Sequence, residues 1–138
     1  MDDLQNVTVL IVDDKMSNAW VVRKMLERIG IGTVVICESG EEARQAIKQL
    51  PRIDLVLLDL RLPGENGYEI YRSLKAHPEL SETHFVAATA HVLPSEMRRT
   101  QDTGFDGFIS KPFRLGKLRT QIQTILAGEP VWEPQYGG

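Results

Sequence analysis

The sequence has little that would suggest a secreted, membrane-bound or nucleic-acid-binding protein. Its one cysteine, Cys37, excludes a disulfide within the chain. No apolar run reaches about 18 residues, the length that marks a membrane-spanning helix. The acidic start, residues 1–4, lacks the pattern of a signal peptide. The net charge of −3 provides no basic surface for nucleic acid. We therefore expect a cytoplasmic protein with no membrane span and no nucleic-acid partner.

Motifs for nucleotide and zinc binding are missing as well. The sequence contains neither GxGxxG nor GxxxxGK[ST], so it gives no sign of a dinucleotide or nucleoside triphosphate site. Its three histidines, at positions 77, 84 and 91, lack the Cys or His partners of a zinc site. What remains is ordinary for one globular domain: 138 residues, 42% hydrophobic and 25% charged.

Short apolar runs alternate with helical patterns along the chain. Ser39 and Glu42 have the spacing of a capping box at the start of one such helix. The alternation predicts an α/β fold, a doubly wound five-stranded parallel sheet with helices on both faces. The helices are expected between and after the strands, and the strands themselves are expected near residues 7–12, 33–37, 54–58, 84–88 and 106–109.

Polar side chains follow four of the five predicted strands at the point where each strand ends. Asp13 and Asp14 follow the first, Asp59 the third, Thr89 the fourth and Lys111 the fifth. Ligands of open α/β sheets bind outside the carboxyl ends of the strands. Each residue alone has a structural explanation, such as a helix cap for Asp13 and Asp14. The joint pattern instead predicts one pocket.

The carboxylates of this pocket suit a divalent cation. Crowded carboxylates repel each other unless a cation compensates. Mg²⁺ prefers oxygen ligands and usually takes one or two carboxylates together with water and phosphate oxygens. We expect Asp14 and Asp59 as direct ligands and Asp13 as a ligand through water. Mn²⁺ is an alternative ion.

The same pocket suits a phosphoryl group. An aspartate carboxylate such as that of Asp59 can act as a nucleophile toward phosphorus and form an aspartyl phosphate. Lys111 would neutralise a phosphoryl oxygen as a mobile point charge. Thr89 supplies a hydroxyl, and the backbone N–H of Ala90 can donate beside it. The sequence therefore predicts phosphoryl transfer onto Asp59.

The strand-end motifs resemble those of the receiver domain of two-component response regulators, including the single-domain chemotaxis regulators. The resemblance covers roughly residues 6–127 and implies a flavodoxin-like (βα)5 fold with strand order 2-1-3-4-5. It rests on VLIVDD at 9–14, DLVLLDLRLPGENG at 54–67, AATA at 87–90 and GFISKPF at 107–113.

The resemblance also implies roles for the pocket residues. Asp59 would accept a phosphoryl group from a phosphohistidine on a sensor histidine kinase or a histidine phosphotransfer protein. Mg²⁺ would be held by Asp13, Asp14, Asp59 and the backbone carbonyl of Arg61. The protein would catalyse only its own phosphorylation and dephosphorylation, so we expect a signalling switch and not an enzyme.

Four positions would govern switching and phosphoryl lifetime. Thr89 would swing toward the phosphoryl group, and Phe108 would move inward with it. The surface of the fourth helix, fifth strand and fifth helix would then change and be read by a protein target. The resemblance also implies that Arg61 and His91 occupy positions that modulate phosphoryl lifetime in the family. Arg61 would screen the phosphoryl group from water, although both side chains could simply face solvent.

The expected organisation is a receiver domain at residues 1–128 and a C-terminal tail at 129–138. With only about ten residues after the receiver pattern, we expect a stand-alone regulator, a monomer or weak homodimer. The two prolines and final Gly-Gly of the tail favour a mobile segment. Its Trp132 and Tyr136 instead favour docking, since both would be large apolar groups to leave in water.

Several functions stay open on the sequence alone. Output would pass either through a phosphorylation-gated adaptor surface or through a phosphorelay to a histidine phosphotransfer protein. A metal-dependent phosphohydrolase is a remote alternative, because that chemistry normally needs a second Asp two residues after the nucleophile, where this chain has Arg61. A receiver that serves only as a scaffold is disfavoured by the intact acidic set.

Overall fold

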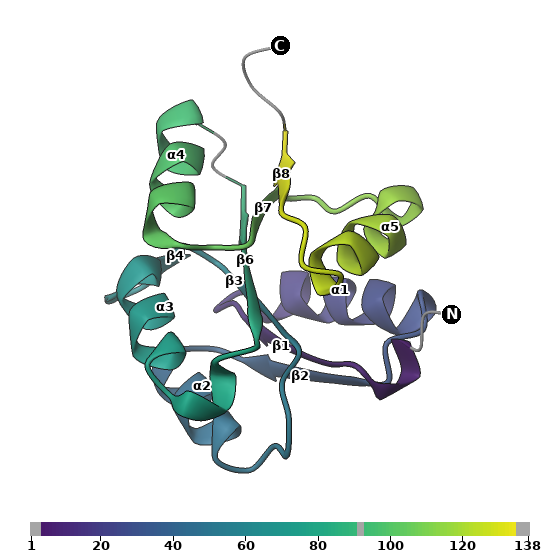
Figure 1. Cartoon of the computed structure of the whole chain (residues 1–138), viewed down its shortest axis with the longest axis horizontal. Coiled ribbons are helices and arrows are strands. Elements are labelled where there is room, and N and C mark those ends of the chain that lie inside the picture. Colours follow the sequence, from purple (N-terminus) through teal and green to yellow (C-terminus); the bar gives the residue numbers. More distant parts are fainter. Residues whose placement is uncertain (1–3, 91–92, 135–138) are drawn as a thin grey trace.

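The computed structural model describes residues 4–90 and 93–134, which form a parallel sheet between two helical layers (Figure 1). Helices α1 and α5 lie on one side of the sheet, and α2, α3 and α4 lie on the other. The sheet has the strand order β2-β1-β3-β6-β7-β8, and every neighbouring pair is parallel. Its strands are β1 (Thr8–Val12), β2 (Thr33–Cys37), β3 (Leu55–Leu58), β6 (His84–Thr89), β7 (Gly107–Ser110) and β8 (Val131–Glu133).

The predicted α/β class and doubly wound topology are confirmed, and the five expected strands occur in the order 2-1-3-4-5. The predicted strand count was too low by one, because β8 extends the sheet beyond β7. A small antiparallel hairpin, β4 (Arg61–Leu62) with β5 (Glu65–Asn66), follows β3 and was also not expected. The helices are α1 (Met16–Arg28), α2 (Gly40–Ile47), α3 (Gly67–Lys75), α4 (Pro94–Thr103) and α5 (Leu115–Leu126), with short 3₁₀ turns at Leu4–Asn6 and Pro78–Leu80.

The central strands are mostly apolar because the helical layers bury both of their faces. In β1, Leu10 and Val12 pack toward α2, α3 and α4, whereas Val9 and Ile11 pack toward α1 and α5. Successive side chains of a strand point to opposite faces, so a continuous apolar run fills both layers. This two-sided burial fixes the register of the strands and so fixes where their carboxyl ends lie.

A local signal in the sequence sets the start of α2. The Ser39 hydroxyl accepts from the backbone N–H of Glu42 at 3.1 Å, and the Glu42 carboxylate accepts from the backbone N–H of Glu38 at 2.9 Å. The predicted capping box therefore forms, with its return bond one residue earlier than usual. In α5, Leu118, Ile122 and Ile125 are buried, whereas Leu115 is 39% exposed. Within residues 4–90 and 93–134, no helix is long and apolar enough to span a membrane.

The tail does not follow the mobile pattern that its prolines favoured. Residues Val131–Glu133 pair with β7 as the edge strand of the sheet. Trp132 is partly buried against the core, which agrees with the alternative that an aromatic tail docks on its own domain. Tyr136 lies outside the described residues. The apolar side chains of the segment favour docking. Its prolines do not prevent docking, because a strand can accept prolines at its flanks.

The Cys37 thiol gives a testable pH dependence of stability. Burial, with a smaller contribution from the Glu42 carboxylate, raises the pKa of Cys37 from 9.0 to about 11. The unfolded chain therefore releases this proton at lower pH than the folded chain does. The stabilising contribution is present below about pH 9 and is lost as pH rises toward about 11, by up to roughly 2 kcal/mol. Urea unfolding under reducing conditions should show a shallower alkaline loss for Cys37→Ala. Equal slopes would contradict this assignment.

Candidate functional site

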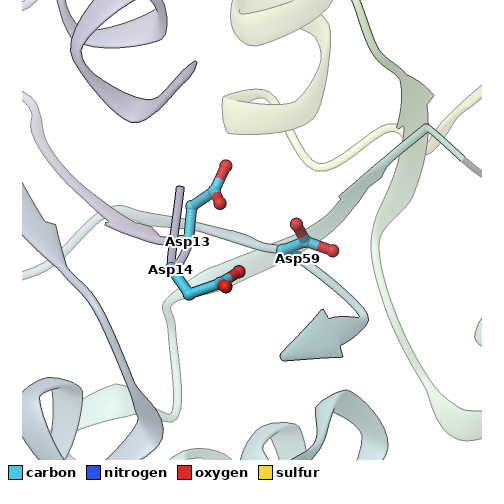
Figure 2. Close-up of side chains that lie close together, drawn as sticks. All are labelled: Asp13, Asp14 and Asp59. Atoms are coloured by element: carbon cyan, nitrogen blue, oxygen red, sulfur yellow. The ribbon is translucent and has the colours of Figure 1, made fainter. Parts of the chain in front are cut away.

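Three carboxylates meet at the carboxyl ends of two neighbouring strands. Asp13 and Asp14 directly follow β1, and Asp59 directly follows β3. The two strands pair in register, Val12 opposite Leu58, so the residues after them are brought together. One oxygen from each of the three carboxylates lies within 4.8 Å of the others, and Figure 2 shows the three side chains grouped in this way.

Lys111 supplies the positive charge of the cluster from the end of β7. Its Nζ donates to Asp13 Oδ2 and, at 3.3 Å, to Asp59 Oδ2. Asp13 and Asp59 are buried, and the Lys111 side chain is only 15% exposed. Ion pairs shielded from solvent in this way are screened little by salt. With all groups ionised, three carboxylates and one ammonium leave a formal charge of −2 in the pocket.

Backbone groups hold the carboxylates in place. Asp13 Oδ1 accepts from the backbone N–H of Lys15, and Asp59 Oδ1 accepts from the backbone N–H of Arg61, both at 2.9 Å. These bonds fix each carboxylate on the turn that follows its strand. The second of these bonds also holds the backbone of Arg61 at the site. The predicted contribution of the Arg61 carbonyl to a metal site stays a prediction.

Asp14 differs from its two neighbours because its Oδ1 is buried with no hydrogen-bond partner among the described residues. A buried acceptor without a partner is costly in a folded protein. A divalent cation would satisfy this oxygen and would also offset the formal charge of −2. The donor set consists of carboxylate oxygens, which are the ligands that Mg²⁺ prefers. The residues present therefore fit such an ion.

Strand pairing in the sheet places Thr89 at the same end of the sheet as this cluster. It ends β6, pairs in register with Ser110 of β7 and is 1% exposed. The backbone N–H of Lys111 donates to the Thr89 carbonyl at 2.8 Å, so the two predicted phosphoryl ligands are tied to each other. Ala90 follows and is exposed. The predicted group of residues is thus brought to one end of the sheet.

The remaining predicted residues have different surroundings. Phe108 is fully buried in the core beneath α4. Its predicted inward movement is not tested by one conformation and stays a prediction. The Arg61 side chain is exposed. His91 lies outside the described residues.

An apolar pocket of about 320 Å³ opens beside Lys111 and was not predicted from the sequence. One wall is α1, with Val21 and Met25, and the other is the segment from Lys111 to Phe113. Val21 is 52% exposed, so an apolar side chain faces solvent in this wall. Val21 lies outside the buried face of α1, which consists of Ala19, Val22 and Leu26. An apolar residue on the solvent-facing side of this helix was the signal in the sequence that could have indicated the pocket.

Comparison with known proteins identifies the family of this domain. The model of the response regulator receiver domain matches residues 9–123. The chain is 29% identical over 125 residues to the signal transduction histidine-protein kinase BarA of Escherichia coli K12, covering 91% of this chain and 13% of BarA. It is 36% identical over 124 residues to the DNA-binding response regulator MtrA of Mycobacterium tuberculosis, covering 90% of this chain and 52% of MtrA. The chain thus spans only part of these relatives.

A structural comparison gives the same fold. The chemotaxis protein CheY4 of Vibrio cholerae superposes with a TM-score of 0.78 at 24% identity, covering 86% of this chain and 98% of CheY4.

The fold and the acidic cluster define an α/β domain with an oxygen-rich ligand site at the carboxyl ends of a parallel sheet. This chain belongs to the response regulator receiver domain family, the phosphoryl-receiving modules of two-component systems.

Proposed function

We propose that this receiver accepts a phosphoryl group on Asp59 from a phosphohistidine, in a reaction that depends on Mg²⁺ held by Asp13, Asp14, Asp59 and the Arg61 carbonyl. The observation that carries the proposal is the three-carboxylate cluster joined by Lys111. Mn²⁺ would fit the same oxygen ligands.

The chemistry is a transfer between two nucleophiles. An Asp59 carboxylate oxygen bonds to phosphorus as the phosphorus–nitrogen bond of the donor breaks, and the electron pair of that bond stays on the imidazole. The cation, when bound, would neutralise charge on the phosphoryl oxygens. Lys111 would exchange part of its contact with Asp13 and Asp59 for a phosphoryl oxygen. Positioning and charge compensation of this kind supply most of the rate in phosphoryl transfer.

The switch would begin with the two residues that share a backbone hydrogen bond. Thr89 would donate its hydroxyl to the phosphoryl group, with the Ala90 N–H beside it, and Lys111 would bind from β7. Movement of these strand ends would be transmitted to Phe108 and to the surface of α4, β7 and α5. A new charge cluster would thereby bias an equilibrium between two conformations.

The donor would dock on the apolar opening beside Lys111. Asp59 is buried, so an imidazole must be delivered by a surface that fits around the pocket. Val21, Met25 and Pro112 line this opening and provide apolar area for that contact. A sensor histidine kinase or a histidine phosphotransfer protein fits this requirement, and the contact would be made in the cytoplasm.

A relay function is the second candidate, alongside an adaptor that binds a protein target when phosphorylated. It is favoured by the similarity to BarA, a histidine-protein kinase. Rapid and reversible phosphoryl transfer to a histidine phosphotransfer protein would support the relay. Target binding that strengthens on phosphorylation would support the adaptor. For either function, the proposed organisation is a receiver domain at residues 1–128 and a tail at 129–138.

Incubation with Mg²⁺ and acetyl phosphate tests the phosphoacceptor directly. We expect intact mass to increase by one phosphoryl group, and a chelator to prevent the increase. A second incubation with a purified phosphohistidine donor separates refusal of a small donor from a lack of the activity. Continuous release of inorganic phosphate from phosphoesters would instead favour a phosphohydrolase.

The lifetime of the phosphoryl group should depend on Arg61. Its side chain is exposed while its backbone holds Asp59, so it is placed to screen the phosphoryl group from water. We expect a stable aspartyl phosphate and a roughly tenfold faster dephosphorylation in Arg61→Asn, equivalent to about 1.4 kcal/mol of barrier. Loss of the phosphorylated mass over time measures this rate. Arg72→Asn, which changes an exposed arginine on α3, is the control, and equal rates in all three proteins would refute the role.

A further inference from the structure

The C-terminal strand β8 covers the edge of the strand that carries Lys111. Gly107, Phe108 and Ile109 of β7 lie in register with Val131, Trp132 and Glu133. In Figure 1, β8 stands at the edge of the sheet with α4 on one side and α5 on the other. Without β8, the edge of β7 would present unpaired backbone groups.

The contact is closely fitted at Gly107. A Cβ at this position would lie 2.8 Å from the carbonyl oxygen of Val131 and 3.3 Å from the side chain of Val86. Glycine therefore permits the close approach of β8. Val131 packs against the core on the α1 and α5 side of the sheet, and Trp132 packs against the core on the opposite side. The strand thus seals both layers at this edge.

β8 is connected to the acidic site through β7. Trp132 is the register partner of Phe108, which is fully buried. Two residues farther along β7, Ser110 pairs with Thr89, and the next residue is Lys111. A shift of the carboxyl end of β7 would therefore change the surface on which β8 is seated.

We propose that β8 is an intramolecular strap, docked on β7 in the unphosphorylated protein and released when Asp59 is phosphorylated. The strap regulates access to the α4, β7 and α5 surface, and this inference rests on the proposed phosphorylation of Asp59. After β8 is released, an extended segment of a protein target takes its place and pairs as a strand with the exposed edge of β7.

The energetics favour β8 as the element that moves. It is only three residues long, and all three residues are half-buried. Short edge segments with few buried contacts open at much lower free energy than the core strands do. The docked position matches the present geometry of β7, in which Lys111 contacts Asp13 and Asp59. Drawing Lys111 and Thr89 toward a phosphoryl group alters that geometry and so weakens docking.

The chain offers a fluorescent reporter for this movement. It has two tryptophans, and Trp20 is 56% exposed on α1, so Trp20→Phe leaves Trp132 as the sole tryptophan. In this Trp20→Phe protein, phosphorylation with Mg²⁺ and acetyl phosphate should shift Trp132 emission to the red and increase its quenching by acrylamide. The docking equilibrium should change by about fivefold or more, as for a typical allosteric coupling. Asp59→Asn in the same background should show no change.

A matched pair of glycine variants tests the reverse direction. Gly107→Ala places a methyl group against the β8 backbone, whereas Gly116→Ala on α5 meets no atom within 4 Å. We expect Gly107→Ala to expose Trp132 without phosphate and to bind Mg²⁺–beryllofluoride, a non-covalent phosphoryl analogue, about fivefold more tightly by linkage. Gly116→Ala should match the parent protein in both measurements.

The outcomes separate the strap from the phosphoacceptor. A phosphoryl adduct seen by mass with unchanged Trp132 emission and quenching would overturn the strap and leave the function of Asp59 intact. Unchanged or weaker analogue binding in a folded Gly107→Ala protein with an exposed Trp132 would overturn the coupling in the same way. The absence of both adduct and analogue binding would overturn the proposed function and the strap together.

Discussion

Asp59→Asn is expected to abolish phosphoryl incorporation completely. The substitution keeps the shape of the side chain and its acceptance from the Arg61 N–H, but it removes the carboxylate that attacks phosphorus. It also removes one of three crowded negative charges, so the variant should be at least as stable as the wild-type protein. Intact mass after incubation with acetyl phosphate and Mg²⁺ measures incorporation, and urea unfolding measures stability.

Asp102→Asn is the matched control for this loss. Asp102 is an exposed aspartate on α4, away from the strand ends, so its variant should be phosphorylated to the wild-type extent. Phosphoryl incorporation into a folded Asp59→Asn protein would show that another residue is the acceptor. Digestion and peptide mass would then identify that residue.

Lys111→Met is expected to cost about 3 kcal/mol of unfolding free energy, because it leaves the buried Asp13 without its ion-pair partner. Methionine keeps most of the volume but no charge, so the formal charge of the pocket changes from −2 to −3. The variant should also incorporate phosphoryl groups roughly 100-fold more slowly, since a charge-stabilising donor is lost. Urea unfolding and time-resolved intact mass measure the two effects.

Magnesium should restore part of the stability lost in Lys111→Met. A ligand that binds only the folded state stabilises it by about 2.7 kcal/mol at 100 times its dissociation constant. The more negative pocket of the variant should bind Mg²⁺ more tightly, so the gain at a fixed concentration should exceed that of the wild-type protein. Lys117→Met, at an exposed position of α5, should change stability by no more than about 0.5 kcal/mol. A Lys111→Met protein as stable as wild type would contradict the neutralising role.

The fold could be predicted because its main signals are local and repeated. The apolar run of β1 fills both layers of the sheet, and the capping box at Ser39 starts α2 as expected. Parallel strands bring their carboxyl ends to the same edge, so the positions of Asp13, Asp14, Asp59 and Lys111 in sequence were sufficient to predict their meeting. No long-range contact had to be known in advance for that step.

The edge strand β8 shows where such reasoning failed. The prolines and glycines of the tail indicated a mobile segment, whereas Trp132 and Tyr136 argued for docking. Whether an aromatic segment docks depends on a complementary surface, which here consists of the β7 edge and the space left by Gly107. That surface is assembled from residues far apart along the chain, so no local pattern describes it.

The sequence by itself determined the layered α/β architecture, the acidic pocket and the residues that form it, because periodicity and strand ends are properties of short segments. Only the tertiary structure decided that Lys111 contacts both Asp13 and Asp59 and that β8 covers β7. It also decided that a buried carboxylate oxygen of Asp14 has no hydrogen-bond partner among the described residues. These three features depend on the distances between segments that are separated in the chain and brought together only by packing.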